Sequence, residues 1–232
     1  HPKACRRALT GSLYYIGGIA LVDQHLIEVM KKLQTESKKR NFVESVELAV
    51  NLKDIDLSNP KNRIQEEIIL PKGRGKQVKV GVFGSSEMAM KARGVADVII
   101  QPEEIEEIAK DKAKAKKFAR ANDFFVAEAP LMPTIGKRLG IILAPRGKMP
   151  KPIPPGSDPK NAVEKLRGSV SVRTRDKNTF HLPIGTKDMA PEDLAENLDA
   201  VLKRLTTKLG RGKMNIRSAY VKTTMGPSFK VI

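Results

Sequence analysis

The segment KTTMGPS, residues 222–228, matches no catalytic signature, although its side chains can make specific contacts. Thr223 and Thr224 each supply a hydroxyl that donates and accepts hydrogen bonds, and Met225 supplies an apolar contact. None of these groups takes up a proton near neutral pH. Gly226-Pro227 restricts the backbone of the turn that follows. The segment therefore predicts a rigid, uncharged recognition surface suited to folded RNA.

Residues that could support acid-base, nucleophilic or metal chemistry are few and scattered. The single cysteine, Cys5, excludes an internal disulfide framework and indicates a reducing compartment, hence the cytoplasm. His1, His25 and His181 show no metal-ligand spacing, and His181 lies in the strand-like stretch NTFHLPI. We therefore expect no catalytic residue, no bound metal and no cofactor.

Two glycine-bearing stretches invite comparison with nucleotide-binding loops. PKGRGKQ, residues 71–77, lacks the G-x-x-x-x-G-K-[ST] pattern, because Gln77 follows Gly75-Lys76 and no glycine lies five positions before Gly75. VGVFGSSE places Gly84 between a predicted strand and helix, where an anion could bind, but the G-x-G-x-x-G pattern is absent. A nucleotide-binding enzyme is therefore the weaker alternative.

The charge balance favours a polyanionic partner. The 232 residues include 43 Lys+Arg against 26 Asp+Glu, which gives a formal net charge of +17. Aromatic residues make up 4% of the chain, without Trp, which disfavours extensive stacking on single-stranded bases. No stretch reaches the roughly 20 apolar residues that span a bilayer. Folded RNA is the favoured target, and a nonspecific basic nucleic-acid chaperone stays open as a further alternative.

Both ends of the chain predict the elements of an α+β domain. Apolar residues at helical spacing predict a helix over 23–39 with Asp23 as its N-cap. Alternation predicts strands at SVELAVNL and IQEEIIL, residues 45–52 and 64–70. Toward the C-terminus, GSVSVRT and NTFHLPI are candidate strands, PEDLAENLDAVLKRL is a helix with Pro191 in its first turn, and MNIRSAYVKTT is the last strand.

The middle of the chain has a different pattern of apolar residues. VKVGVF, ADVII, DFFVA and GIILA are short continuous apolar runs, separated by helical stretches such as SSEMAMKAR and PEEIEEIAK. Continuous apolar strands alternating with helices indicate a parallel sheet buried on both faces. We therefore predict a three-layer α/β domain of Rossmann-like type over residues 74–159.

The fold class expected is an α+β split domain formed by both chain ends, with the α/β domain inserted into it. The split domain spans residues 1–73 and 160–232, and the stiff segments 71–77 and 151–159 are the predicted hinges. Residues 1–19 contain an Arg pair before a mildly apolar run that resembles a short secretory signal. We discount such a signal, because Gly11, Ser12, Gly17 and Gly18 interrupt the run, and we treat residues 1–19 as an extension at the start of the 1–73 segment.

Two basic segments could contact phosphate groups. SKKRNFVES, residues 37–45, sets a basic cluster beside Phe42, which suits phosphate contacts and a packed contact to sugar or base. GKRLGIILAPRGKMPKPIPP, residues 136–155, is expected to run from a basic helix end through a buried strand into a rigid loop. That loop holds Arg146, Lys148 and Lys151. The ordinary alternatives are a core position for Phe42 and a solvated charged loop.

Taken together, KRNFVESVELAVNL, LPKGRGK, LAPRGKMPKPIPP and RSAYVKTTMGPS resemble the ribosomal protein L-one family, in its archaeal form, from about Leu21 onward. The resemblance implies a non-enzymatic stalk protein with an RNA-binding domain built from both termini, an inserted Rossmann-like domain and a hinge. It also implies binding to large-subunit ribosomal RNA, a part in exit-site tRNA release, and repression of translation through the protein's own mRNA. We expect a monomer when free, located on cytoplasmic ribosomes and without membrane contact.

The resemblance also implies an RNA-contacting surface drawn from three motifs. Threonine hydroxyls suit 2′-hydroxyls and base edges in the shallow minor groove, and basic residues supply salt-dependent attraction. Glu44 and Glu47 are either acceptors for 2′-hydroxyls or anchors for neighbouring side chains. Asn41 departs from the family pattern, because many relatives carry lysine there, so the resemblance does not imply a phosphate contact at this position. The residues implied are Lys39, Arg40, Phe42, Glu44, Ser45, Glu47, Arg173, Asp176, Asn178, His181, Ser218, Thr223, Thr224, Met225, Gly226 and Pro227.

Overall fold

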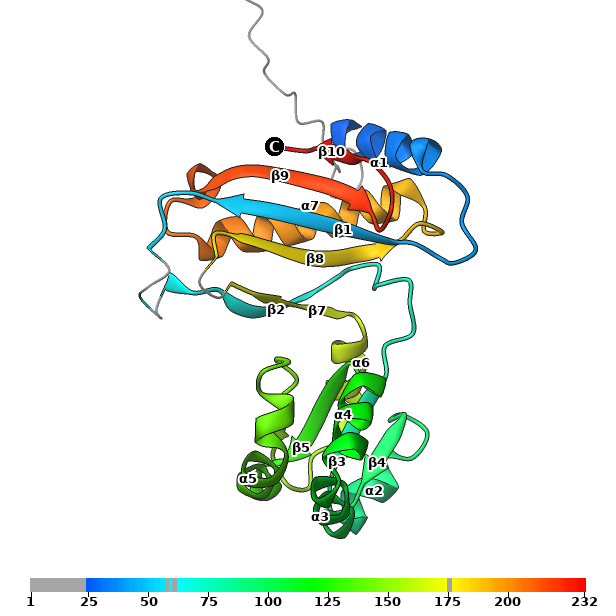
Figure 1. Cartoon of the computed structure of the whole chain (residues 1–232), viewed down its shortest axis with the longest axis vertical. Coiled ribbons are helices and arrows are strands. Elements are labelled where there is room, and N and C mark those ends of the chain that lie inside the picture. The colour runs from blue at the N-terminus through cyan, green and yellow to red at the C-terminus, as the bar shows by residue number, and fades with distance from the viewer. Residues whose placement is uncertain (1–23, 57–58, 60–61, 175–176) are drawn as a thin grey trace, which may run out of the picture.

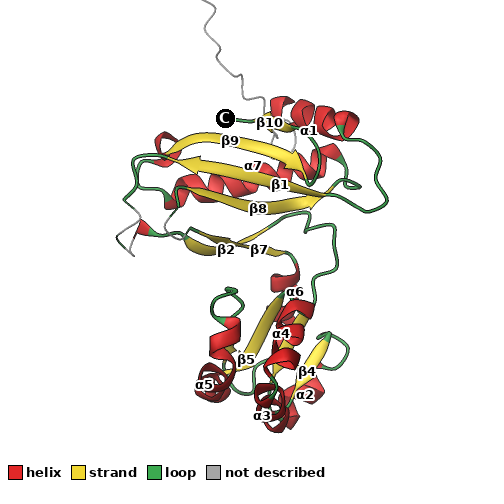
Figure 2. Cartoon of the chain, in the orientation of Figure 1, coloured by secondary structure: helices red, strands yellow, loops and turns green. Residues whose placement is uncertain are grey.

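The computed structural model describes residues 24–56, 59, 62–174 and 177–232, which form two parts joined by two crossings of the chain (Figure 1). The upper part in the figure contains both ends of the described chain, and the lower part contains its middle. Each part has its own sheet and helices, and a two-stranded sheet lies between them (Figure 2).

The upper part is built on an antiparallel sheet in the order β10-β9-β1-β8. Its strands are β1 (Ser45–Leu52), β8 (Thr179–Thr186), β9 (Ile216–Thr223) and β10 (Ser228–Lys230). Two helices, α1 (Gln24–Glu36) and α7 (Pro191–Lys208), share one hydrophobic core with the sheet. The sheet therefore has a helix-covered face and a face that no described helix covers (Figure 1).

Strand β1 shows why the sequence adopts this arrangement. Val46, Leu48, Val50 and Leu52 are buried, whereas the residues between them are half-buried. This is the period-2 pattern of a strand with one face in the core, as predicted. Helix α1 is also confirmed, although it ends at Glu36 rather than at residue 39, and its predicted N-cap lies outside the described residues.

A short antiparallel pair, β2 (Gln65–Ile69) and β7 (Ser169–Arg173), connects the two parts. Ile68, Val170 and Val172 belong to the same hydrophobic core as β1 and α7. Both strands were predicted, and their packing attaches this small sheet to the upper part.

The lower part is a parallel sheet in the order β4-β3-β5-β6. Its strands are β3 (Val80–Phe83), β4 (Val98–Ile100), β5 (Phe124–Glu128) and β6 (Lys151–Ile153). One face packs on α3 (Pro102–Lys110), α4 (Lys112–Ala121) and α5 (Met132–Leu143), and the other packs on α2 (Ser86–Ala92) and α6 (Pro159–Arg167). The predicted parallel sheet with helices on both faces is present.

The expected strand GIILA, residues 140–144, was wrong. Its residues form the end of α5, because Ile135, Leu139 and Leu143 recur every four positions and are all buried. A short apolar run cannot by itself be distinguished from a segment of buried helix. The fourth strand is instead β6, KPI, inside a segment expected to be a hinge. Its Pro152 is tolerated because β6 lies at the sheet edge.

The expected last strand is also followed by another. After β9 the chain turns at residues 224–227 and returns as β10, which pairs with β9 through Ser228 and Lys222. Only three residues pair, too few for a recognisable alternation in the sequence.

The first crossing is held firmly at its upper end. The side chain of Asn197 in α7 accepts a hydrogen bond from the N–H of Lys72 at 3.0 Å and donates to the carbonyl of Gly73 at 2.9 Å. Gly73 and Gly75 have φ values of +68° and +66°, a region that glycine adopts without strain. The predicted domain limits stay a prediction. The packing of α6 against the lower sheet supports an inserted domain that extends to about residue 168.

Candidate nucleic-acid interface

The uncovered face of the antiparallel sheet presents a polar surface made of three ladders of side chains. Asn51 donates to the Ser218 hydroxyl and accepts from the Thr179 hydroxyl, both at 2.8 Å, which fixes one ladder across β8, β1 and β9. The next ladder places His181, Ala49, Tyr220 and Lys230 in line, and the third includes Pro183, Glu47, Lys222 and Ser228. The face combines hydroxyl, amide, imidazole and ammonium groups.

At one end of this face, the turn after β9 is tied to the start of β1. The Ser45 N–H donates to the Thr224 hydroxyl at 3.1 Å, and the Thr224 N–H donates to the Ser45 carbonyl at 3.1 Å. The N–H of Met225 donates to Oε1 of Glu44 at 3.0 Å. We call residues 223–227, held in this way, the anchored turn. Its Met225 side chain is 60% exposed although the backbone beneath it is fixed.

Glu44 is only 2% exposed, so its carboxylate lies beneath the surface. Its Oε2 lies 3.9 Å from the Lys187 ammonium, which also donates to the Ser37 carbonyl at 2.9 Å. These contacts, to the Met225 backbone and to the Lys187 side chain, favour the anchoring role among the two considered for this glutamate. Glu47, by contrast, is half-buried on the open face and pairs in register with Lys222.

Gly226 is required by the packing inside the anchored turn. A Cβ atom at this position would overlap the Thr223 hydroxyl oxygen, so a side chain here forces Thr223 or the turn to shift. Thr223 is fully buried, and among the described residues its hydroxyl has no hydrogen-bond partner. Thr223 therefore shapes the turn from beneath, whereas Thr224, Met225 and Pro227 are exposed.

The basic segment before β1 lies next to the anchored turn. Lys39, Arg40, Phe42 and Val43 are exposed and line a shallow hollow together with Lys187 and other loop residues. Phe42 is 53% exposed, so the alternative of a core position for it was wrong. This hollow and the turn bring positive charge, an aromatic ring and a methionine to one end of the sheet.

The other predicted contacts lie farther along the face or away from it. His181 is exposed at the middle of the face, and Asn178 is exposed at the end opposite to the anchored turn. Ser218 is nearly buried and is used by Asn51. Asp176 lies outside the described residues. The sheet thus brings His181 and Asn178 onto one surface with the turn, but at increasing distance from it.

Arg173, another predicted contact, lines a cavity and does not belong to the anchored turn. It ends β7 and, with Arg74, Arg146 and Lys148, lines a cavity of about 350 Å³ between the upper and lower parts. A side chain built on Gly147 would come within 3.4 Å of its guanidinium. Pro183 of the third ladder lines the same cavity, so Arg173 lies beside the open sheet face and not on the anchored turn.

The loop after α5 was expected to offer its cations to phosphate groups. In the structure, these cations contact other parts of the protein instead. The Lys148 ammonium donates to the carbonyls of Ala119 at 3.0 Å and Asn122 at 2.6 Å. Arg146 donates to the Lys116 carbonyl at 3.1 Å, and Lys151 forms an ion pair with Glu67 of β2. Burial lowers the pKa of Lys148, Asp123 opposes this shift, and Arg146 adds to it. All three cations therefore have partners within the protein.

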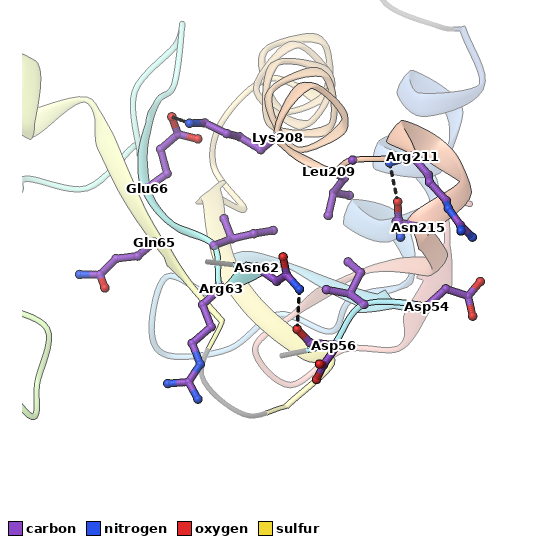
Figure 3. A pocket seen from close by; sticks show the side chains of 13 residues that line it. Asp54, Asp56, Asn62, Arg63, Gln65, Glu66, Lys208, Leu209, Arg211 and Asn215 are labelled. Atoms are coloured by element: carbon purple, nitrogen blue, oxygen red, sulfur yellow. Dashed lines mark hydrogen bonds and ion pairs between the residues drawn. The ribbon is translucent and has the colours of Figure 1, made fainter. Parts of the chain in front are cut away.

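A cavity of about 530 Å³ lies at the end of the upper part opposite to the anchored turn, and charged residues of both signs line it (Figure 3). Its charged side chains include Lys208, which lies 3.6 Å from Glu66, and Arg211. The backbone N–H of Arg211 donates to the Asn215 side chain at 2.8 Å. The Asn62 amide donates to the Asp56 carbonyl at 2.9 Å. The mixed charge and these internal partners do not favour a site for a polyanion.

The carboxyl ends of the parallel strands, where Rossmann-like folds bind nucleotides, are occupied by the protein itself. Glu128, at the end of β5, accepts hydrogen bonds from the Ser85 N–H at 3.1 Å and from its hydroxyl at 2.9 Å. These donors would otherwise face an anionic ligand. Gly84 packs against Met88, leaving no room for a side chain. The nearly buried carboxylate repels phosphate, which argues against the nucleotide-binding alternative.

The sequence analysis did not predict several residues of the open face. Tyr220 and Lys222 could have been found, because β9 alternates and both lie on its half-exposed side. Lys230 could not, because its place depends on the pairing of the unpredicted β10 with β9. Val43 is 58% exposed, although its apolar side chain suggested a buried position.

The fold and this surface define a two-part α/β protein with an open sheet face and an adjoining anchored turn. The described residues contain no group of three or more His, Cys, Asp or Glu placed to hold a metal ion. Residues 33–227 match the model of the Ribosomal protein L1p/L10e family, and the chain belongs to that family. This is a family of ribosomal proteins and not of enzymes, as expected.

Archaeal proteins are among the similar relatives. The chain is 54% identical to the large ribosomal subunit protein uL1 of Methanocella arvoryzae over 89% of this chain and 97% of that protein. It is 54% identical to the uL1 protein of Thermoplasma acidophilum, over 87% and 93%. The uL1 protein of Archaeoglobus fulgidus is 51% identical, over 89% and 97%. In the part of the chain that the structure describes, no helix is long and apolar enough to cross a membrane.

Proposed function

We propose that this chain is a component of the large ribosomal subunit and binds folded ribosomal RNA with the open sheet face and the anchored turn. Family membership and the names of the uL1 relatives support the place on the ribosome. The formal net charge of +17 supports a polyanionic partner.

The observation that carries the proposal is the anchored turn itself. Its backbone is tied to Glu44 and Ser45, so Met225 can contact a ligand at little further cost in conformational entropy. Phe42 lies on the segment that leads into Glu44 and offers a second apolar contact. A shallow RNA minor groove, lined by sugars and 2′-hydroxyls, matches such a firm and largely neutral surface.

Charge has a supporting role in this binding. Lys39 and Arg40 lie beside the turn, and Lys222 and Lys230 lie on the open face. These groups attract the phosphate backbone in a salt-dependent manner without distinguishing one RNA from another. Specificity then depends on the neutral residues of the turn and of the ladders on β1 and β9.

The finer parts of the proposal rest on the resemblance to the family. We propose that the ribosomal RNA site is the mobile stalk and that the protein assists release of exit-site tRNA there. We also propose that it represses translation of its own mRNA, through an RNA element that mimics the ribosomal site. One binding surface would serve both RNAs, so each should compete with the other.

The experiment that tests the proposal is filter binding of the chain to the stalk region of large-subunit RNA and to an unrelated hairpin, at two salt concentrations. A specific reader binds the stalk RNA far more tightly, and the margin persists at the higher salt. A nonspecific basic chaperone binds both alike with a dominant salt effect. A titration with fluorescent nucleotide covers the enzyme alternative, and saturable nucleotide binding would support that alternative.

A further inference from the structure

The inserted part carries a groove that the proposed RNA surface does not use. It lies where α4, α5 and the end of α3 meet, and it encloses about 370 Å³. Aliphatic residues and cations line it together: Ile141, Ile142 and Pro145 on the one hand, and Lys112, Lys116, Arg138 and Arg146 on the other. The groove therefore combines an apolar contact with a single sign of charge.

Ile141 is the most exposed large hydrophobic residue in the part of the chain that the structure describes, at 84%. Its neighbours Leu139 and Leu143 are buried against the lower sheet, so α5 already has its core contacts without Ile141. One exposed aliphatic side chain is ordinary on a protein surface. Here, however, Ile142 and Pro145 adjoin it in the same groove.

The charge around the groove is one-sided. None of the residues that line it is acidic, and α4 beside it has the sequence KAKAKKFARA, with five cations and no carboxylate. A neighbouring hollow shares Ala109 and Arg138 with the groove and adds Lys110 and Lys137. Its one acid, Glu106, lies 3.4 Å from Arg138. The cationic lining thus continues along α5.

We propose that this groove docks an acidic protein segment that places an aliphatic side chain against Ile141. Carboxylates of the segment would lie against Lys112 and Lys116, where opposite charges attract and steer association. A protein segment is favoured over RNA, because the residues that line the groove include aliphatic side chains and no aromatic ring for base stacking. The proposal concerns a protein partner and is independent of the RNA surface.

The test uses the full chain and a labelled synthetic peptide of Glu and Leu patterned as an amphipathic helix. A second peptide carries Ser in place of every Leu. Fluorescence anisotropy should show saturable, salt-sensitive binding of the Leu peptide, and binding of the Ser peptide should be at least about tenfold weaker. Absence of saturable binding, or equal binding of both peptides, would overturn the proposal.

Variants locate the binding. Ile141→Asp should weaken binding of the Leu peptide at least about tenfold, and Lys112→Ala with Lys116→Ala should weaken it about fivefold and reduce its salt dependence. The matched control is Met90→Asp, because Met90 is 67% exposed on α2, on the opposite side of the lower sheet. Thermal unfolding and ribosomal RNA binding of all variants should match the parent chain.

Three other results would contradict the proposal. Unchanged binding in Ile141→Asp would place the peptide elsewhere. Displacement of the peptide by an unrelated RNA hairpin that itself requires Ile141 would make RNA the occupant. Self-association of the chain in sedimentation, abolished by Ile141→Asp, would make a second copy the occupant, with the acid-rich α3 as the matching surface.

Discussion

Oε1 of Glu44 accepts a hydrogen bond from the N–H of Met225 at 3.0 Å, across 181 residues of sequence. The acceptor is buried before β1, whereas the donor belongs to the turn after β9, whose methionine faces solvent. A charged group hidden in the fold therefore fixes the position of a neutral side chain at the surface. Sequence order alone gives no hint of this connection.

We expect Glu44→Ala to reduce both stability and RNA affinity. It removes a charged acceptor from the Met225 N–H and leaves the Lys187 ammonium without its carboxylate. The expected loss in unfolding free energy is about 2 kcal/mol. Urea unfolding and filter binding with the stalk RNA measure the two effects. Glu47→Ala is the matched control for stability, and an equal loss of stability there would contradict the anchoring role.

Gly226→Ala should disturb the anchored turn from within. The added Cβ overlaps the Thr223 hydroxyl, so we expect a loss of about 1–3 kcal/mol in unfolding free energy and weaker binding of the stalk RNA. The double variant with Thr223→Ala removes the obstructing oxygen and should recover part of both losses. Gly210→Ala meets nothing within 4 Å and is the control. A double variant no better than the single one would refute this steric account.

Asn197 should contribute more to the unfolding free energy than an ordinary buried amide does. Its side chain is fully buried and bonds to Lys72, to Gly73 and to the Ile184 carbonyl, which fastens the first crossing to α7 and β8. Asn197→Leu leaves these backbone groups unsatisfied, and we expect a loss of about 2–4 kcal/mol in unfolding free energy. Thermal unfolding measures it, with the exposed Asn178→Ala as control. A loss no greater than that of the control would show that the crossing is held by other contacts.

The lowered pKa of Lys148 predicts a distinctive pH dependence. Burial moves the pKa below its ordinary 10.5, so the unfolded chain binds this proton more tightly than the folded chain. The cost of burying the ammonium is therefore present below the folded pKa and disappears as pH rises toward 10.5. Relative to Lys148→Met, the parent chain should gain unfolding free energy over that window. A constant difference would count against the shift, and Lys114→Met is the exposed control.

The sequence was sufficient for most elements of the fold but not for every strand. The alternation of SVELAVNL and the Pro-initiated helix at Pro191 are local signals, and both elements are where they were predicted. GIILA failed because a run of apolar residues has no period of its own, and only the recurrence of Ile135, Leu139 and Leu143 marks it as helix. The strand β6 failed because a short edge strand with proline resembles a linker.

The sequence indicated which residues lie at the candidate site better than it indicated what each side chain does there. The motifs around Glu44 and Thr223 lie together in the structure, yet both side chains are buried and act beneath the surface. Such roles depend on pairing across the sheet, which sets Ser45 beside Thr224. Arg173 lies at the cavity between the two parts because β7 belongs to the connecting sheet, and this pairing is invisible to local patterns.

The most direct test of the central claim compares two exposed methionines. Met225 is 60% exposed on the anchored turn, and Met214 is 73% exposed in the short 3-10 helix before β9. We predict that Met225→Ala weakens filter binding of the stalk RNA about tenfold and leaves the unrelated hairpin unaffected. Met214→Ala and Lys114→Ala should change the stalk RNA affinity little. Equal losses in all three variants, or none in Met225→Ala, would contradict the assignment of the anchored turn as the specific RNA reader.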